Sequence, residues 1–251
     1  MHTASRILKV KEAQAALQVV YEQKLPALSA ALSKLQDQAL SNPQLLDIAS
    51  HAYSAASVRL LIVGQQTQSW FGEWKDTKGK PPAEAVRELL KRYHEFDLGE
   101  EIRGTPFWHC SHKLYRLLNP TGPENGFLYS NLIKMDGWNE KKRQWGYPGW
   151  QTEELLNNWF DVLVSEVKLA EPDVVVFFTG HRYDECIQRI FLGAQFSTTA
   201  PPGFGPNWLS IVKHDKLPQH SYRTYHPGYL NRQGRHRRDA ILEAIRSLVS
   251  G

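Results

Sequence analysis

The chain has 251 residues, of which 41% are hydrophobic and 22% are charged, a globular composition that excludes a disordered or collagen-like protein. Its two cysteines, Cys110 and Cys186, are too few for a disulfide scaffold or for a four-thiolate zinc or iron–sulfur site. We therefore expect no metal or other cofactor, and two reduced thiols in a cytoplasmic protein. No signal peptide opens the chain and no run of 18 apolar residues occurs, so no membrane contact is expected.

Residues 1–56 are predicted to form an N-terminal helical segment packed on a core. Apolar positions recur at helical spacing over residues 8–35 and again over residues 45–52. Pro26 is expected to start or kink a helix within the first stretch.

Residues 57–251 alternate predicted strands and helices. Short apolar runs predict strands at residues 60–63 and 174–178, and residues 127–133, 209–212 and 221–225 are predicted as further strands. Helical patterns cover residues 81–93, 107–118, 152–169, 182–191 and 237–249. This alternation is typical of one α/β domain with three α/β/α layers around a mainly parallel sheet of four to five strands. Ligands of such sheets gather at the carboxyl ends of the strands.

Positive charge concentrates near the carboxyl end of the chain, although the net charge is only +4. Seven Lys or Arg residues lie between Lys213 and Arg238, against one acidic residue, Asp215. A solvated basic face explains this as well as a polyanionic partner does.

Polar motifs follow the predicted strands, while the motifs of several enzyme classes are missing. The glycines do not have the spacing of a phosphate-binding loop, and neither GxSxG nor HExxH occurs. Four segments remain: Gly64–Phe71, Tyr129–Lys134, Glu171–Gly180 and Tyr225–Arg232.

In their order and spacing these four segments resemble the uracil-DNA glycosylase superfamily over residues 58 to 240. The segment from Tyr225 to Arg232 looks most like the thermophilic-type branches of that superfamily. In the family, a Gly-Gln or Gly-Glu loop positions water, an Asn reads the flipped base, and a Leu after His-Pro intercalates. The resemblance implies these roles for Gln66, Asn131 and Leu230.

The same resemblance implies a monofunctional DNA glycosylase that flips a base out of DNA and hydrolyses its N-glycosidic bond. His226 would donate a hydrogen bond to the departing base, aided by the loop that contains Gln65. Leu230 is expected on a loop, as a wedge in the vacated stack. Phosphate contacts are expected from the arginines that follow it, Arg232, Arg235, Arg237 and Arg238.

Two positions depart from the best-known branch of that family. Gln66 replaces the Asp that orients the attacking water, and Asp136 is a candidate substitute base. Gln68 replaces a Tyr whose ring excludes 5-substituted pyrimidines. We therefore hypothesise a pocket for a pyrimidine with a bulky or polar 5-substituent, such as a modified phage cytosine, which would make the protein an antiviral glycosylase. A role in DNA repair stays open.

Aromatic and basic residues complete the expected site. Phe71 is favoured over Trp70 and Trp74 as the ring that stacks on the flipped base. Lys141 and Arg143 lie among tryptophans, a pattern that suits tracking along a DNA backbone and equally suits a packed surface loop.

The expected protein is a monomer whose partner is DNA. Two other functions stay open. One is a catalytically weak module that binds damaged or abasic DNA, and the other is a hydrolase of free nucleosides or nucleotides.

Overall fold

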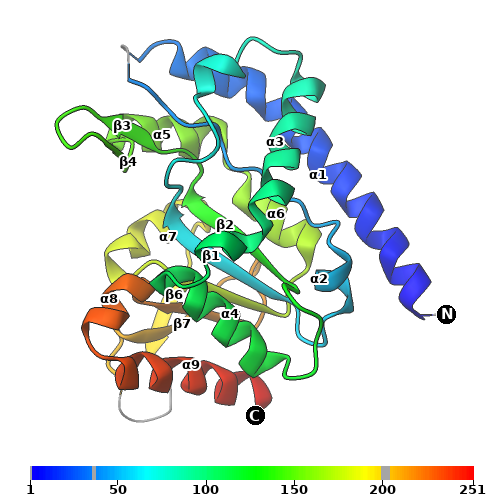
Figure 1. The fold of residues 1–251 in the computed structure, drawn as a ribbon, viewed down its shortest axis with the longest axis vertical. Coiled ribbons are helices and arrows are strands. Elements are labelled where there is room, and N and C mark those ends of the chain that lie inside the picture. Colours follow the sequence, from blue (N-terminus) through cyan, green and yellow to red (C-terminus); the bar gives the residue numbers. More distant parts are fainter. Residues whose placement is uncertain (1, 36–37, 199–203) are drawn as a thin grey trace.

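The computed structural model describes residues 2–35, 38–198 and 204–251, and Figure 1 shows their arrangement. In these residues the main sheet has six strands in the order β2-β1-β5-β8-β7-β6. The first four strands in this order are parallel, and β7 and β6 continue the sheet as antiparallel strands. The strands are β1 (Leu60–Gln66), β2 (Phe127–Ile133), β5 (Val174–Phe178), β6 (Gln195–Thr198), β7 (Leu209–Lys213) and β8 (His220–Thr224).

The α/β class and the mainly parallel sheet are confirmed, but the prediction of four to five strands is too low. The missed strand, β6, contains only one apolar residue, Phe196, and lies at the sheet edge, where pairing with β7 rather than burial determines its structure. Strand β5 is a continuous apolar run, and β2 is buried along its whole length although it contains Ser130 and Asn131, because helices cover the sheet.

Helices surround the sheet. Figure 1 shows the central strands between the α4 and α9 pair on one side and the α1 and α3 pair on the other, an arrangement compatible with three layers. The helices are α1 (His2–Leu32), α2 (His51–Ala55), α3 (Pro82–Phe96), α4 (Pro106–Leu118), α5 (Trp150–Trp159), α6 (Leu163–Ala170), α7 (Asp184–Ile190), α8 (Pro227–Arg232) and α9 (Arg235–Ser250). No helix in the described residues has the length and apolar character needed to cross a bilayer.

The N-terminal segment differs from its prediction. Helix α1 continues through Pro26 and buries one face that includes Leu17, Tyr21 and Leu28. The helix predicted over residues 45–52 is wrong, because residues 42–50 form no regular element and α2 begins only at His51. In that stretch the side chains of α1 replace helical hydrogen bonds: the Tyr21 hydroxyl accepts from the Leu46 N–H, and Gln14 accepts from the Ile48 N–H.

One further stretch was predicted incorrectly, and another contains strands that were not predicted. The single helix predicted over residues 152–169 is two helices, α5 and α6, whose break lets both Phe160 and Val162 become buried. The polar, aromatic stretch after β2 contains a hairpin of β3 (Gly137–Asn139) and β4 (Gln144–Gly146). Trp138 and Trp145 face each other across this hairpin, with ring centroids 5.6 Å apart.

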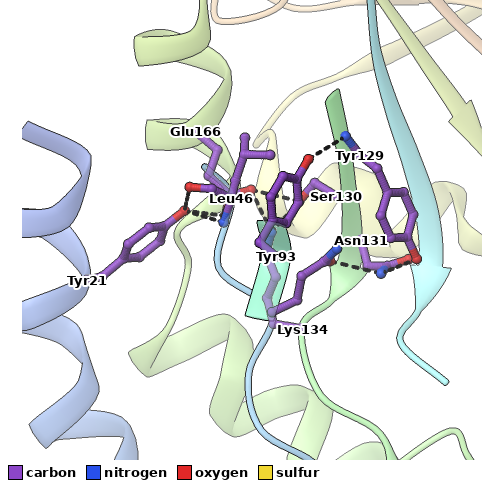
Figure 2. A network of polar contacts seen from close by, with 9 residues as sticks. Tyr21, Leu46, Tyr93, Tyr129, Ser130, Asn131, Lys134 and Glu166 are labelled. Carbon is purple, nitrogen blue, oxygen red and sulfur yellow. Dashed lines mark hydrogen bonds and ion pairs between the residues drawn. The ribbon is translucent and has the colours of Figure 1, made fainter. Parts of the chain in front are cut away.

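A buried polar network links the N-terminal helix to the sheet (Figure 2). The Lys134 ammonium lies 2.5 Å from a carboxylate oxygen of Glu166 on α6, and both side chains are buried. Tyr21 on α1 donates to the same carboxylate at 2.8 Å, as does Ser130 on β2. The network therefore joins α1, α6 and the residue that follows β2.

Candidate functional site

A pocket of about 770 Å³ opens where β1 and β2 end, bounded by the start of α4 and the loop after β8. Its volume lies within the range of small-molecule sites, about 300–1,000 Å³. Much of its wall is aromatic: Trp70, Phe71, Phe96, Phe107, Trp108 and Tyr129. Gln66, Asn131 and His226, which are far apart in the sequence, all line it. The parallel register explains this convergence, because it brings the carboxyl ends of β1, β2 and β8 to one edge.

Asn131 lies at the buried end of the pocket, with none of its surface exposed. Its amide nitrogen donates to Gln44 Oε1 at 2.9 Å and to the Tyr129 hydroxyl at 2.7 Å, as Figure 2 shows for the tyrosine. Its Oδ1 atom is buried and has no hydrogen-bond partner among the residues that the structure describes. A buried acceptor without a partner costs roughly 1–3 kcal/mol, so this oxygen favours a ligand that carries a donor.

Gly64 makes this placement of Asn131 possible. The two residues are register partners on β1 and β2, and a Cβ at position 64 would collide with Asn131 Oδ1. The glycine that ends the apolar run of β1 therefore makes room for the unpaired carbonyl oxygen.

His226 precedes α8 and presents a defined tautomer. Its Nδ1 accepts the backbone N–H of Gly228 at 3.1 Å, so the neutral ring carries its proton on Nε2. Burial, with a smaller contribution from the positive charge of Arg232, lowers the pKa of His226 from 6.5 to about 4. Phe107 stacks on the ring with centroids 5.6 Å apart. At neutral pH this side chain is therefore an uncharged hydrogen-bond donor.

Three glutamines from the end of β1 and the loop after it line the pocket. Gln65 donates to the Thr179 carbonyl at 2.7 Å and ties β1 to the end of β5. Gln66 Oε1 accepts from the Tyr183 hydroxyl at 3.2 Å. Gln68 has no ring to narrow the pocket and is exposed.

Asp136, the candidate substitute base, does not line the pocket. It is fully buried, and its carboxylate accepts from Thr67 Oγ1 and from the Ser69 N–H, each at 2.6 Å. The carboxylate of Asp136 instead holds the loop after β1 in place.

Leu230 and Arg238 also lie elsewhere than predicted. Leu230 belongs to α8 rather than to a loop, and it is fully buried where α8 packs against α4 and α9. It cannot act as a wedge from this position. Arg238 is buried and donates to Asn231 at 2.7 Å and to Asp239 at 2.8 Å, so it joins α8 to α9 instead of facing phosphates.

The other predicted basic residues are exposed. Arg232 and Arg237 lie over the rings of Tyr229 and Trp208, at 5.8 and 4.6 Å from the ring centroids, and Arg235 is exposed at the start of α9. Lys141 and Arg143 are exposed between β3 and β4 and do not line the pocket.

Of the candidate stacking rings, Phe71 lines the pocket and Trp74 does not. Phe71 is half-buried and lines the pocket, with its ring edge-on to Trp70. Trp70 also lines the pocket but is buried, and Trp74 is buried outside it.

Sequence reasoning missed three residues of the site. Phe107 lies in the first turn of α4, after Pro106, and only the helix itself was predicted there. Glu101 lines the pocket from the 3₁₀ turn η2 (Asp97–Ile102), a stretch without a periodic pattern. Gln44 reaches Asn131 from the irregular part of the N-terminal segment. The only signal in the sequence was a polar residue next to apolar ones.

No three His, Cys, Asp or Glu side chains gather as a metal site within residues 2–35, 38–198 and 204–251. No protein-family model matches the chain, and no curated protein matches its sequence. The fold and the site thus define a class: an α/β protein with an aromatic-walled pocket at the carboxyl edge of a mainly parallel sheet.

Proposed function

We propose that this protein is a monofunctional DNA glycosylase with the three-layer fold of the uracil-DNA glycosylase superfamily. The observation that carries the proposal is the convergence of Gln66, Asn131 and His226, from three separate strand ends, on one pocket. A base within a duplex cannot reach such a pocket, so the nucleotide must leave the stack, at a cost of a few kcal/mol.

Asn131 reads the edge of the extruded base. Its nitrogen is engaged by Gln44 and Tyr129, so its free Oδ1 accepts a hydrogen bond from the base. The N3–H of uracil and the exocyclic amine of cytosine both supply such a donor. This contact therefore accepts pyrimidines of either type.

His226 stabilises the base as it departs. Cleavage of the C–N bond places negative charge on the base, and the neutral Nε2–H donates to a base oxygen as that charge grows. A donor of this kind contributes about 3–4 kcal/mol to transition-state stabilisation in other enzymes. No proton transfer from the imidazole is needed.

The DNA backbone is held by the exposed arginines beside the pocket. Arg232 is on α8, which begins directly after His226, while Arg235 and Arg237 are in the first turn of α9. Guanidinium groups here contact phosphates and orient the strand without reading its sequence. Both cysteines are free thiols, which suits a protein that acts on DNA in the cytoplasm, and the proposed acting form is a monomer.

The substrate is a pyrimidine that carries a substituent at its 5-position. The pocket has a volume of about 770 Å³, and at the position where the best-known branch has an excluding tyrosine ring it has Gln68. Modified cytosines of phage DNA belong to this substrate class, which makes antiviral defence the proposed biological role.

The test measures base release from four duplexes, which carry uracil, a thymine mispair, hydroxymethylcytosine or glucosylated hydroxymethylcytosine. Abasic sites are cleaved with alkali and counted. We expect release of at least one 5-substituted base, and a loss of about 10²–10³-fold in H226A. The matched control H220A changes a histidine that bonds Tyr222 outside the pocket, and it should keep its activity.

Activity on uracil alone would reject the wide-pocket substrate. Absence of abasic product from all four duplexes would reject the glycosylase. Turnover of free nucleosides in the same preparation would then identify a nucleoside hydrolase, and salt-dependent binding to abasic DNA without any turnover would identify a binding module.

A further inference from the structure

The pocket holds one carboxylate among the described residues, and it belongs to Glu101. The acid expected on the loop after β1 is an amide, Gln66, and Asp136 is buried outside the pocket. Glu101 is exposed, and within the described residues its side chain has no hydrogen bond or ion pair. Its neighbour Glu100 is different, because it pairs with Arg103 at 3.0 Å and does not line the pocket.

Glu101 lies at the mouth of the pocket rather than at its floor. Asn131 is fully buried and marks the floor, whereas Glu101 and Ile102 are exposed, with Ile102 45% accessible. A nucleotide that enters base first places its sugar, and therefore the C1′ atom of the glycosidic bond, at the mouth. In such a complex Glu101 would be at the same end of the pocket as the reacting carbon.

The turn that carries Glu101 is held firmly against the wall. Gly99 has a φ of +69°, which favours glycine, and a Cβ at this position would collide with the ring of Trp108. Trp108 is itself buried and lines the pocket. Close packing of Gly99 on this ring therefore holds the Glu101 turn next to the wall.

We propose that Glu101 is the carboxylate that activates water in the glycosylase reaction, an inference that rests on the proposed function. The C1′–N bond breaks and its electron pair leaves with the base, while positive charge develops on the sugar. The oxygen of a water molecule bonds to C1′, and a proton of that water passes to the Glu101 carboxylate. This proton then returns to the departed base, so the reaction consumes one water and yields an abasic sugar and a neutral base.

Gln66 cannot perform this step, because an amide does not take up a proton at neutral pH and its Oε1 already accepts from Tyr183. The Glu101 carboxylate takes up the proton of the attacking water, and its negative charge also stabilises the cationic sugar. The same charge repels the phosphates of bound DNA. Glu101 therefore favours the transition state over the ground-state complex, and differential binding of this kind is what accelerates a reaction.

The test compares E101Q with E100Q, which removes the adjacent, paired carboxylate. Single-turnover rates are measured on the best substrate of the wild-type protein, and DNA affinity is measured with an uncleavable analogue. We expect E101Q to lose about 10²-fold or more in rate. We also expect E101Q to bind DNA at least as tightly as the wild type, and E100Q to stay within about twofold of it in both measurements. Added formate should restore part of the rate of E101A and none of the rate of H226A.

Full activity of E101Q would refute this role and leave the proposed function intact. A loss of rate that is matched by weaker DNA binding would also refute it, because Glu101 would then be a binding residue. If the wild-type protein releases no base from any of the four duplexes, the proposed function fails and the role of Glu101 fails with it.

Discussion

Replacement of Lys134 by methionine tests the buried network that supports the site. The ammonium is 2.5 Å from Glu166 and also contacts Ser130, and the side chains of Lys134 and Glu166 are only 2% and 0% accessible. Burial lowers the pKa of Lys134, and the negative charge of Glu166 opposes this shift. Lys134 and Glu166 are both removed from water, so each charge depends on the other for compensation.

The expected magnitude follows from this burial. K134M leaves the Glu166 carboxylate with the hydroxyls of Tyr21 and Ser130 but with no positive partner. Breaking a buried pair in this way costs about 3–5 kcal/mol. For a chain of this size each kcal/mol lowers Tm by about 2–4 °C, so we expect a decrease of roughly 6–20 °C.

Urea and thermal unfolding, followed by circular dichroism, measure the effect, and two further variants sharpen it. K134M/E166Q removes the uncompensated charge while Tyr21 and Ser130 keep a hydrogen-bond partner, so it should be more stable than K134M. K168M changes an exposed lysine of α6 and should stay within about 0.5 kcal/mol of the wild type. The reasoning is refuted if K134M loses less than about 1 kcal/mol, or if the double variant is as unstable as K134M.

Three other predictions follow from the site. The folded pKa of His226 is about 4 against an ordinary 6.5, so between these pH values the unfolded chain binds a proton that the folded chain excludes. The free energy of unfolding should therefore fall by up to roughly 3 kcal/mol between pH 6.5 and pH 4. Urea titrations should show a weaker fall in H226Q. R237A removes an exposed arginine and should reduce the slope of log Kd for DNA against log salt concentration by about 1. R238A removes a buried arginine that bonds Asn231, so it should leave this slope unchanged. It should lower the free energy of unfolding by about 1.5–3 kcal/mol in unfolding assays. G64A should cost about 1–3 kcal/mol of stability and abolish base release, because its methyl group displaces Asn131, and an active G64A would contradict this account.

The two central strands β1 and β5 were predictable because their runs are apolar on both faces. The runs at residues 60–63 and 174–178 needed no knowledge of their neighbours, and parallel pairing then brings the strand ends to one edge. The common location of Gln66, Asn131 and His226 follows from this topology alone. Strand β6 was not predictable in this way, because its pairing with β7 is its main stabilisation.

Side-chain direction was much harder to predict than strand position. Asp136 follows β2 as closely as a pocket residue would, yet its carboxylate turns to Thr67 and Ser69. The error at Leu230 was avoidable. Proline is favoured in the first turn of a helix, so Pro227 after the capping side chain of His226 indicates the start of α8 rather than a loop.

Site residues in irregular segments could not be identified from the periodicity of the sequence. Neither Glu101 nor Gln44 belongs to an α-helix or strand, so no periodicity places them. Gln44 reaches the site through a contact that is distant in sequence, the hydrogen bond that links it to Asn131 across 87 positions.

The bond between Gln44 and Asn131 also limits what the proposed reader can distinguish. An amide that is held in one orientation and reads a pyrimidine with both of its ends tells uracil from cytosine, because the two bases exchange donor and acceptor along that edge. Here Gln44 and Tyr129 engage the nitrogen end, and only Oδ1 is free for the base. Gln44 lies outside residues 58–240, which the family resemblance covers. The N-terminal segment is therefore what leaves Asn131 with only its oxygen free for a base. If the proposed function holds, selection among pyrimidines would then rest on their 5-substituents, because Gln68 lines the pocket in place of the excluding tyrosine ring.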